Sequence, residues 1–398
     1  MVTRRTKFLR LNDLHQEGAH QVPSQKIIFL QSSIGTSSMS DSPVSDKPLE
    51  QHAALPVFDG HNDVLSRLWR LHRDNPTDAF LNGPSQGHID LPRIRQGGFA
   101  GGLFATYVPS ANGDATSIPG GNVSLTTPSM AQARDISFWM LSTLLRLEAA
   151  SDGQLRVCRS VADIRRCMAE GVVAAVMHIE GAEMLDADLD LLGILYAAGL
   201  RSLGPLWSRP NIFGQGVPFR FPSSPDTGDG LTDAGLRLVR ACNAKRILVD
   251  LSHMDEKGFW QTAAVSDAPL VASHSNAHAL CAQSRNLTDS QLAAIRERDG
   301  FVGVNFGTSF LRADGRKDPT ATVQEIVRHV EYLLEKLGEN GVGFGSDLDG
   351  TTIPGDMKDV AGFPILVQAL AGRGYSRTLL EKICYGNWLR VLEATWGE

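Results

Sequence analysis

Short apolar runs rich in β-branched residues alternate with longer amphipathic segments from Leu55 to the end of the chain. Parallel strands need crossover connections of about a dozen residues, usually helices, so this alternation predicts a parallel sheet. The eight apolar runs begin near residues 55, 102, 172, 201, 246, 269, 301 and 341. Because eight is the strand number of a (β/α)8 barrel, we expect an α/β protein with a TIM barrel, and an open doubly wound sheet is the alternative.

Two of the segments between these runs repeat apolar residues at helical spacing, residues 231–244 and 323–337. Thr232 and Thr322 stand at their starts and are suitable N-caps, because a hydroxyl oxygen can accept a hydrogen bond from a free N–H of the first turn. Residues 209–230 are rich in Pro, Gly and Phe and predict a long loop after the fourth strand. Loops longer than about 12 residues in a compact domain are usually functional or disordered.

The first 50 residues mix basic, polar and Ser/Pro-rich segments. We expect a disordered extension over residues 1–50 and a single domain over residues 51–398. The apolar cluster at residues 27–30 is too short for the core of a signal peptide. Met39, which precedes a polar run, is an alternative start of the natural protein.

Composition excludes several classes of partner. The 38 basic and 44 acidic residues give a net charge of −6, and no dense basic run follows the first ten residues, so we expect no nucleic acid partner. No stretch approaches the roughly 18 apolar residues that cross a bilayer, and the C-terminus has no hydrophobic tail, so we expect no membrane anchor. The five cysteines lack metal-type spacing and predict buried thiols in a reducing, cytoplasmic location.

Ionisable residues stand at the ends of the apolar runs. After the first run, His61 and Asp63 lie two positions apart and therefore point to the same side of a strand, as ligands of a borderline cation such as Zn²⁺ would. Four later runs also end in His, Asp or Glu, at residues 178–181, 250–253, 273–276 and 345–350. All strand ends of a barrel converge on one mouth, so we expect one cluster, with too many ligands for one four-coordinate cation. We therefore predict a binuclear metal site at the C-terminal ends of the strands.

The order of these motifs resembles the membrane (renal) dipeptidase family of the amidohydrolase superfamily, in particular its bacterial members, from about Pro56 to Leu392. The resemblance includes the segment around Arg285 and the closing segment 386–391. It implies two Zn²⁺, although other divalent cations would suit the same ligands. The implied ligands are His61 and Asp63 for one metal, His253 and His274 for the other, and Glu180 as the bridge.

Two further residues complete the expected active site. Asp347 is placed to pass a proton from the nucleophile to the departing amine, and an added metal ligand is its alternative role. Arg285 would hold the C-terminal carboxylate of a substrate, because guanidinium and carboxylate form a bidentate pair. Supporting positions are expected for three other ionisable residues, His178, Glu183 and Asp349, with a packed core position as the alternative for His178.

One position departs from the family pattern. Mammalian-type members have a histidine after the fourth strand that would steady the oxyanion, and we align Trp207 with it. The metals would then stabilise the oxyanion, with His278 or Arg209 as alternatives. The aromatic residues of the long loop that could close over a small substrate are Phe213, Phe219 and Phe221.

We therefore expect a metallo-dipeptidase that hydrolyses L,L and also L,D dipeptides by means of a hydroxide bound at two divalent cations. The alternatives are an N-acyl amino-acid deacylase or lactonase with the same site, and a catalytically silent barrel that acts as a binding protein. The full set of ligands argues against a silent barrel, and Arg285 argues against a lactonase. A deacylase stays open because its product also carries a carboxylate. A homodimer stays open as well.

Overall fold

The structure, a computed structural model, describes residues 55–110 and 125–397. The predictions for the N-terminal extension and for a start at Met39 lie outside these residues. Nine strands of the described residues form one sheet, eight of them in the order β6-β5-β4-β2-β1-β9-β8-β7 and the ninth, β3, paired with β4 beside this path. All their pairings are parallel. The strands are β1 (Val57–Asn62), β2 (Phe99–Tyr107), β3 (Leu155–Val157), β4 (Val173–Glu180), β5 (Leu200–Gly204), β6 (Leu248–Val249), β7 (Val271–Ser275), β8 (Phe301–Val304) and β9 (Val342–Phe344).

The two ends of this sheet, β6 and β7, meet and close a barrel. Asp250 and Val271 form an isolated parallel bridge, and the backbone N–H of Leu251 donates to the carbonyl of Val271 at 2.8 Å. The predicted TIM barrel is confirmed, and each of the eight expected apolar runs coincides with a strand.

The short strand β3 was not predicted. It pairs with residues 173–175 of β4, whereas β5 pairs with residues 177–180 of the same strand. β3 therefore occupies the edge of β4 that β5 leaves free. Its sequence, Leu155-Arg156-Val157, is too short and too polar in the middle to form an apolar run.

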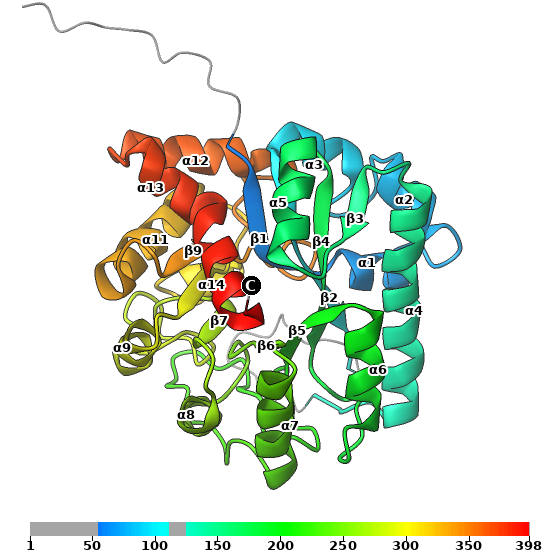
Figure 1. The fold of residues 1–398 in the computed structure, drawn as a ribbon. Helices are drawn as coiled ribbons and strands as arrows, with labels where there is room; N and C mark the ends of the chain where they lie inside the picture. The colour runs from blue at the N-terminus through cyan, green and yellow to red at the C-terminus, as the bar shows by residue number, and fades with distance from the viewer. Residues whose placement is uncertain (1–54, 111–124, 398) are drawn as a thin grey trace, which may run out of the picture. The chain divides into compact units, whose positions relative to one another are not determined.

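Helices connect the strands and cover the outside of the barrel (Figure 1). The helices are α1 (Val64–Leu71), α2 (Pro76–Leu81), α3 (Leu91–Gly97), α4 (Met130–Ala150), α5 (Val161–Glu170), α6 (Asp190–Ala198), α7 (Asp233–Ala244), α8 (Glu256–Val265), α9 (Asp289–Glu297), α10 (Thr308–Leu311), α11 (Val323–Leu337), α12 (Phe363–Gly372), α13 (Arg377–Glu381) and α14 (Asn387–Trp396), with a 3₁₀ turn at Val360–Gly362 and a π turn at Lys382–Gly386.

The two helices predicted in detail, α7 and α11, begin within two residues of the expected starts. The Thr232 hydroxyl accepts a hydrogen bond from the N–H of Gly235 and caps α7 as predicted. The predicted cap of α11 was wrong. Thr322 makes no side-chain capping bond within the described residues, and the N–H of Val323 donates instead to the carboxylate of Asp356. A carboxylate near a helix N-terminus also interacts favourably with the helix dipole.

The last helix, α14, lies across the end of the barrel at which the strands begin, in front in Figure 1. Asn387 donates to the carbonyl of Val342 at the start of β9, and Arg390 donates to the carbonyl of Gly300 next to β8. Trp388 is fully buried in the barrel, where its ring centroid lies 4.3 Å from that of Phe301. This end of the barrel is therefore closed by packing.

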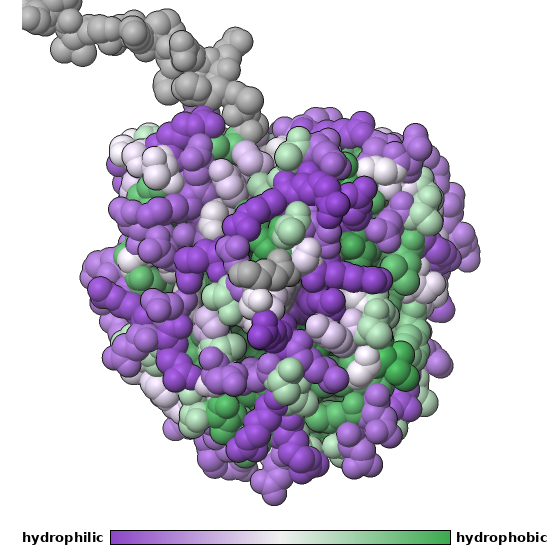
Figure 2. All heavy atoms as spheres, viewed as in Figure 1, coloured by the Kyte–Doolittle hydropathy of each residue, from purple (hydrophilic) through white to green (hydrophobic). Residues whose placement is uncertain are grey.

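Hydrophilic residues cover much of the face on the α14 side, and hydrophobic ones show along the edge where α4 and α6 run (Figure 2). Exposed apolar side chains of these helices include Phe138, Leu145 and Ile194. Within the described residues, no helix is long and apolar enough to cross a membrane. All five cysteines are buried free thiols, as the sequence predicted.

Candidate metal centre and substrate pocket

The first candidate ligands stand where β1 passes into α1. Asp63 occupies the N-cap position of α1, but its carboxylate makes no capping bond, and its Oδ2 lies 3.4 Å from the Nε2 atom of His61. Asp59 fixes the end of β1 against β9, since its carboxylate accepts hydrogen bonds from the N–H and the hydroxyl of Ser346 at 2.6 and 2.7 Å. Both candidate ligands are buried. The hydrogen bonds of Asp59 therefore fix the end of β1, where His61 and Asp63 lie close together.

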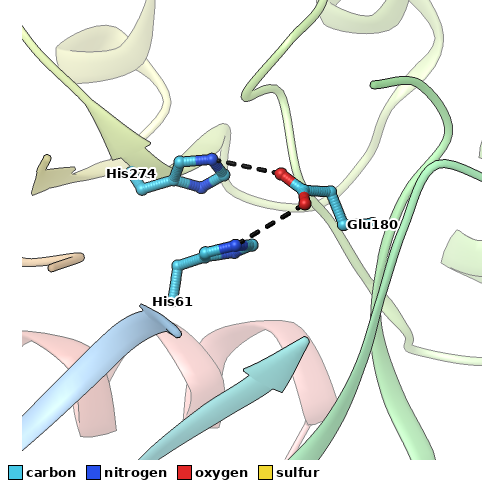
Figure 3. Close-up of side chains that lie close together, drawn as sticks. All are labelled: His61, Glu180 and His274. Carbon is cyan, nitrogen blue, oxygen red and sulfur yellow. Dashed lines mark ion pairs between the residues drawn. The ribbon is translucent and has the colours of Figure 1, made fainter. Parts of the chain in front are cut away.

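Glu180, the last residue of β4, faces the imidazoles of His61 from β1 and His274 from β7 (Figure 3), and that of His253 from the segment after β6. Its Oε1 atom lies 2.9 Å from Nε2 of His253 and 3.3 Å from Nε2 of His274. Its Oε2 atom lies 3.7 Å from Nε2 of His61. The two oxygens of this carboxylate therefore face different candidate ligands.

The donor set fits divalent cations. Ligand atoms lie within 4.8 Å of one another in two groups, His61 with Glu180 and His274, and His61 with Asp63 and Asp347. Among the described residues, the buried atoms Nε2 of His61 and Oδ1 of Asp63 have no hydrogen-bond partner. A buried polar atom without a partner costs about 1 to 3 kcal/mol, and a cation would satisfy both atoms. Imidazole nitrogens and carboxylate oxygens are the ligands that zinc and similar cations take.

The electrostatics of the cluster agree with this fit. Burial holds the pKa values of His253 and His274 well below the ordinary value for histidine, so both imidazoles are neutral at pH 7. The next largest cause is the charge of Arg285 for His253 and the charge of His61 for His274. A neutral imidazole is the form that binds a metal. Burial, with the nearby charge of Asp63, raises the pKa of Glu180 well above its ordinary value. A bound cation would reverse that penalty, because it stabilises the ionised carboxylate.

Serine hydroxyls orient two of the imidazoles. The hydroxyl of Ser208 lies 2.8 Å from Nδ1 of His253, and that of Ser273 lies 2.7 Å from Nδ1 of His274. Ser273 also donates its proton to the carboxylate of Asp250 at 2.5 Å. The Ser273 oxygen must therefore accept from the Nδ1–H of His274, which leaves the lone pair of Nε2 free for a ligand bond.

Asp250 is a buried residue beside the cluster to which the sequence analysis gave no role. Besides Ser273, its carboxylate accepts from the N–H groups of Ser252 and Ser273 at 3.0 and 2.8 Å. Its backbone forms the bridge that closes the barrel between β6 and β7. The position of an aspartate three residues before His253, at the end of an apolar run, was the available signal.

The side chains of the three residues expected in supporting positions are all buried, and within the described part of the chain none of them lines the pocket. His178 lies behind the cluster, with Nδ1 2.9 Å from the hydroxyl of Ser202, and burial lowers its pKa to about 4. Glu183 pairs with Arg209 at 2.8 Å. Asp349 forms an ion pair with Arg67, whose Nε atom lies 3.1 Å from its Oδ2 atom.

A pocket of about 190 Å³ opens over the cluster. Its lining includes the candidate ligands Asp63, Glu180 and His253. The aromatic residues of its wall are Tyr107, Trp207, Phe219, Phe221 and Phe310.

The long loop after β5 contributes two of the aromatic rings, Phe219 and Phe221, which therefore lie where the predicted closure over a small substrate would need them. Phe219 stacks on Phe310 with ring centroids 6.0 Å apart, which joins this loop to the segment after β8. The prediction was wrong for Phe213, which is fully buried in the hydrophobic core. Its backbone oxygen accepts from Thr232 at the start of α7, so this part of the loop packs against the barrel.

Neither residue proposed as a substitute for the family histidine fills that place. Within residues 55–110 and 125–397, His278 and Arg209 are not part of the pocket lining. The Nε2 atom of His278 lies 2.9 Å from the carbonyl of Ser223. Arg209 bonds to Glu183, Ser110 and the carbonyl of Val108, with its guanidinium 5.0 Å from the centroid of Trp207. Arg209 therefore supports the Trp207 ring from behind.

Arg285 and Asp347 both line the pocket. Arg285 donates to the hydroxyl of Ser275 at 2.9 Å and to the carbonyl of His274 at 3.0 Å. Its Nε atom is buried and has no hydrogen-bond partner among the described residues. Burial lowers the pKa of Arg285 to about 10, so it remains charged at pH 7. Asp347 accepts from the side-chain amide of Asn305 at 2.9 Å, and burial, together with the charge of Asp63, raises its pKa to about 7.

Comparisons with known proteins agree with this geometry. The family model of the membrane dipeptidases, peptidase family M19, matches residues 47–396. An uncharacterized protein in the pqqA 5' region of Klebsiella pneumoniae is 53% identical over 264 residues, which cover 66% of this chain and 97% of that protein.

Two solved structures are similar over most of the chain. One is a metallo peptidase from Rhodobacter sphaeroides liganded with a phosphinate mimic of the dipeptide L-Ala-D-Ala, with 51% identity, a TM-score of 0.84 and coverage of 86% of this chain and 100% of that one. The other is the dipeptidase AC, a metallo peptidase of family M19, with 50% identity, a TM-score of 0.83 and coverage of 87% and 100%.

Proposed function

Because the chain belongs to the membrane dipeptidase family and is a metallo-dipeptidase, we propose that it hydrolyses dipeptides with two divalent cations bound at the mouth of the barrel. The observation that supports two cations instead of one concerns the Glu180 carboxylate. One of its oxygens faces His253 and His274, and the other faces His61. His61 and Asp63 would hold one cation, His253 and His274 would hold the other, and Glu180 would offer one carboxylate oxygen to each. Zinc is the proposed metal, because imidazole and carboxylate together are its usual ligands.

When bound, the two cations supply a nucleophilic hydroxide near neutral pH and polarise the scissile carbonyl. Asp347 accepts the proton of the nucleophile and gives it to the departing amine. Burial raises the pKa of Asp347 above that of an exposed aspartate, which makes its carboxylate a better acceptor for this proton. The amide of Asn305 holds the carboxylate in place.

Arg285 binds the C-terminal carboxylate of the substrate. Its guanidinium is buried at the pocket and held by Ser275 and the carbonyl of His274. The Nε atom without a partner among the described residues offers a hydrogen bond to a ligand. The terminal carboxylate of a dipeptide lies one residue beyond the scissile bond. A fixed positive charge near the metal ligands therefore favours peptides that end one residue after that bond.

Trp207 and the neighbouring aromatic rings shield the site on one side. Trp207 lies 5.8 Å from His253 and 4.9 Å from Tyr107, measured between ring centroids. With the ring of Trp207 where mammalian-type members of the family have a histidine, stabilisation of the oxyanion would fall to the bound cations. Exclusion of water by the aromatic wall strengthens every charge interaction in the site.

The proposed substrates include L,D as well as L,L dipeptides. The support for the L,D series is the likeness to the Rhodobacter sphaeroides peptidase, whose structure holds a mimic of L-Ala-D-Ala. The test is a comparison of kcat/KM for L-Ala-L-Ala, L-Ala-D-Ala, N-acetyl-alanine and a simple lactone with the zinc-loaded enzyme. We expect hydrolysis of the dipeptides and little of the others. Faster turnover of N-acetyl-alanine would favour a deacylase.

Metal stoichiometry tests the binuclear site directly. Metal-free protein is titrated with Zn²⁺, and bound metal and activity are measured at each point. We expect activity to reach its maximum at about two equivalents per chain, as in two-metal hydrolases. Full activity at one equivalent would contradict the proposal.

A further inference from the structure

Gln283 lines the pocket but has no part in the proposed mechanism. It stands two residues before Arg285, in the segment that joins β7 to α9, and it is only 4% exposed. Its side-chain oxygen, Oε1, accepts a hydrogen bond from the backbone N–H of Arg285, with 2.5 Å between the two heavy atoms. Because a backbone N–H can only donate, this contact fixes which end of the side-chain amide is the oxygen and which is the nitrogen.

The nitrogen of this amide, Nε2, makes no hydrogen bond within residues 55–110 and 125–397. It carries two hydrogens and can only donate. The Nε atom of Arg285 is a second donor that has no partner among the described residues. A donor in a buried side chain is unfavourable without a partner, so both groups are suited to an acceptor that enters the pocket.

Hydrogen bonds on both sides hold the Gln283 backbone in place. The N–H of Ser284 donates to the carbonyl of Arg220 at 3.0 Å, and the hydroxyl of Ser284 accepts from the N–H of Arg220, also at 3.0 Å. On the other side, the carbonyl of Ala282 accepts from the N–H of Ser223 at 2.9 Å. Because the loop after β5 fixes this segment before a substrate binds, little conformational entropy is lost when Gln283 contacts a ligand.

The carboxylate that Arg285 is proposed to bind can accept more hydrogen bonds than this arginine supplies. Its two oxygens accept about two hydrogen bonds each. The two terminal nitrogens of the Arg285 guanidinium already donate to the protein, one to the hydroxyl of Ser275 and the other to the carbonyl of His274. A further donor from the same segment would therefore find an acceptor position on the substrate carboxylate.

We propose that the Nε2 amide of Gln283 binds the C-terminal carboxylate of the substrate together with Arg285. This inference rests on the proposed function and deepens it, because it adds a second residue that recognises a free C-terminus. The oxygen of the Gln283 side chain holds the backbone of Arg285, and the nitrogen donates to the substrate. A hydrogen bond to an ionised carboxylate is stronger than one to a neutral carbonyl, so this contact favours a free C-terminus over an amidated one.

The experiment compares Ala-Ala, in whichever stereochemical series the zinc-loaded enzyme hydrolyses faster, with the same dipeptide amidated at its C-terminus. The measured quantity is the ratio of kcat/KM for the free dipeptide to kcat/KM for the amidated one. Gln283→Met removes the donor and should lower this ratio roughly tenfold, the scale of one hydrogen bond to a charged group. Gln283→Glu keeps an acceptor for the N–H of Arg285 but replaces the donor with a negative charge, so it should lower the ratio further.

A second comparison separates direct binding from support of Arg285. If Gln283 acted only by holding the Arg285 backbone, its replacement would not change the ratio once Arg285→Met has removed the guanidinium. We expect the double variant Q283M/R285M to have a ratio several-fold below that of Arg285→Met alone, because Nε2 contacts the carboxylate itself. Equal ratios for the single variant Arg285→Met and the double variant would overturn the proposal.

Gln291→Glu is the matched control. Gln291 is 2% exposed, and its Oε1 atom also accepts from a backbone N–H, that of Thr288 at 2.9 Å, away from the residues that line the pocket. Glutamate at this position keeps the capping box of α9, so the ratio should stay unchanged. A ratio that neither Gln283→Met nor Gln283→Glu changes would overturn the role of Gln283 and leave the dipeptidase proposal intact. Failure of the unaltered enzyme to hydrolyse Ala-Ala in either series would overturn both.

Discussion

At the end of the barrel where the strands begin, Trp388 fills the interior against Phe58 and Phe301, and α14 satisfies free carbonyl groups of the strands. At the other end, the interior holds imidazoles and carboxylates, some of whose buried atoms have no partner among the described residues. The buried apolar surface at the first end stabilises the folded state. The buried polar groups without partners at the second end destabilise it, but they are available to bind ligands. The difference indicates that one end maintains the fold and the other performs the chemistry.

The sharpest test of this comparison is Asp347→Asn at the open end. If Asp347 moves a proton and is not a required metal ligand, the variant should keep both metals and lose roughly 10² to 10⁴-fold in kcat. Steady-state kinetics and elemental analysis measure the two quantities. Loss of one metal would place Asp347 in the coordination sphere instead, in agreement with its position within 4.8 Å of the ligand atoms of His61 and Asp63.

Trp388→Ala tests the closed end. Removal of a fully buried tryptophan should lower the free energy of unfolding by about 3 to 5 kcal/mol, through lost burial and a cavity in the barrel. Denaturant unfolding of the metal-free protein measures the change. The control is Trp260→Ala on α8, where the side chain is 39% exposed and the loss should be much smaller. Equal losses of unfolding free energy for the two variants would show that the stability of the barrel does not depend on the packing of Trp388.

Arg285→Met returns to the open end and tests substrate binding. Removing a buried charged partner costs on the order of 2 to 5 kcal/mol, so kcat/KM for a dipeptide should fall by at least about 30-fold. The same dipeptide with an amidated C-terminus should be hydrolysed poorly by both enzymes and change little. If both substrates lose equally, Arg285 acts through folding or general electrostatics, and its role as a carboxylate clamp is wrong.

Ser273→Ala tests whether the hydrogen bonds behind the ligands matter. Without the hydroxyl between Asp250 and His274, the imidazole loses the partner that sets its tautomer. We expect zinc affinity to fall by roughly 10 to 100-fold, the usual effect of losing such a partner. Competition with a chromogenic chelator measures it. Ser224→Ala, on the exposed part of the long loop, is the control and should leave the affinity unaltered.

The sequence by itself determined the eight strands that make up the barrel and the position of the chemical motifs. Both are local properties: a strand shows as an apolar run, and a ligand shows as a histidine or carboxylate at the end of that run. The convergence of His61, Glu180 and His274 could be predicted because every parallel barrel brings its strand ends to one mouth. The resemblance to a family then assigned roles to residues that spacing alone left open.

The tertiary structure decided the contacts between segments far apart in the chain. Asp356 caps α11 in place of Thr322, and β3 pairs with the part of β4 that β5 leaves free. Asp250 forms the backbone bridge that closes the barrel, and its carboxylate accepts a hydrogen bond from the Ser273 hydroxyl. The loop after β5 sends Phe219 to the pocket but Phe213 into the core, although both are phenylalanines in one loop. No local pattern distinguishes such positions, because burial and hydrogen bonding depend on which distant atoms the fold brings within reach.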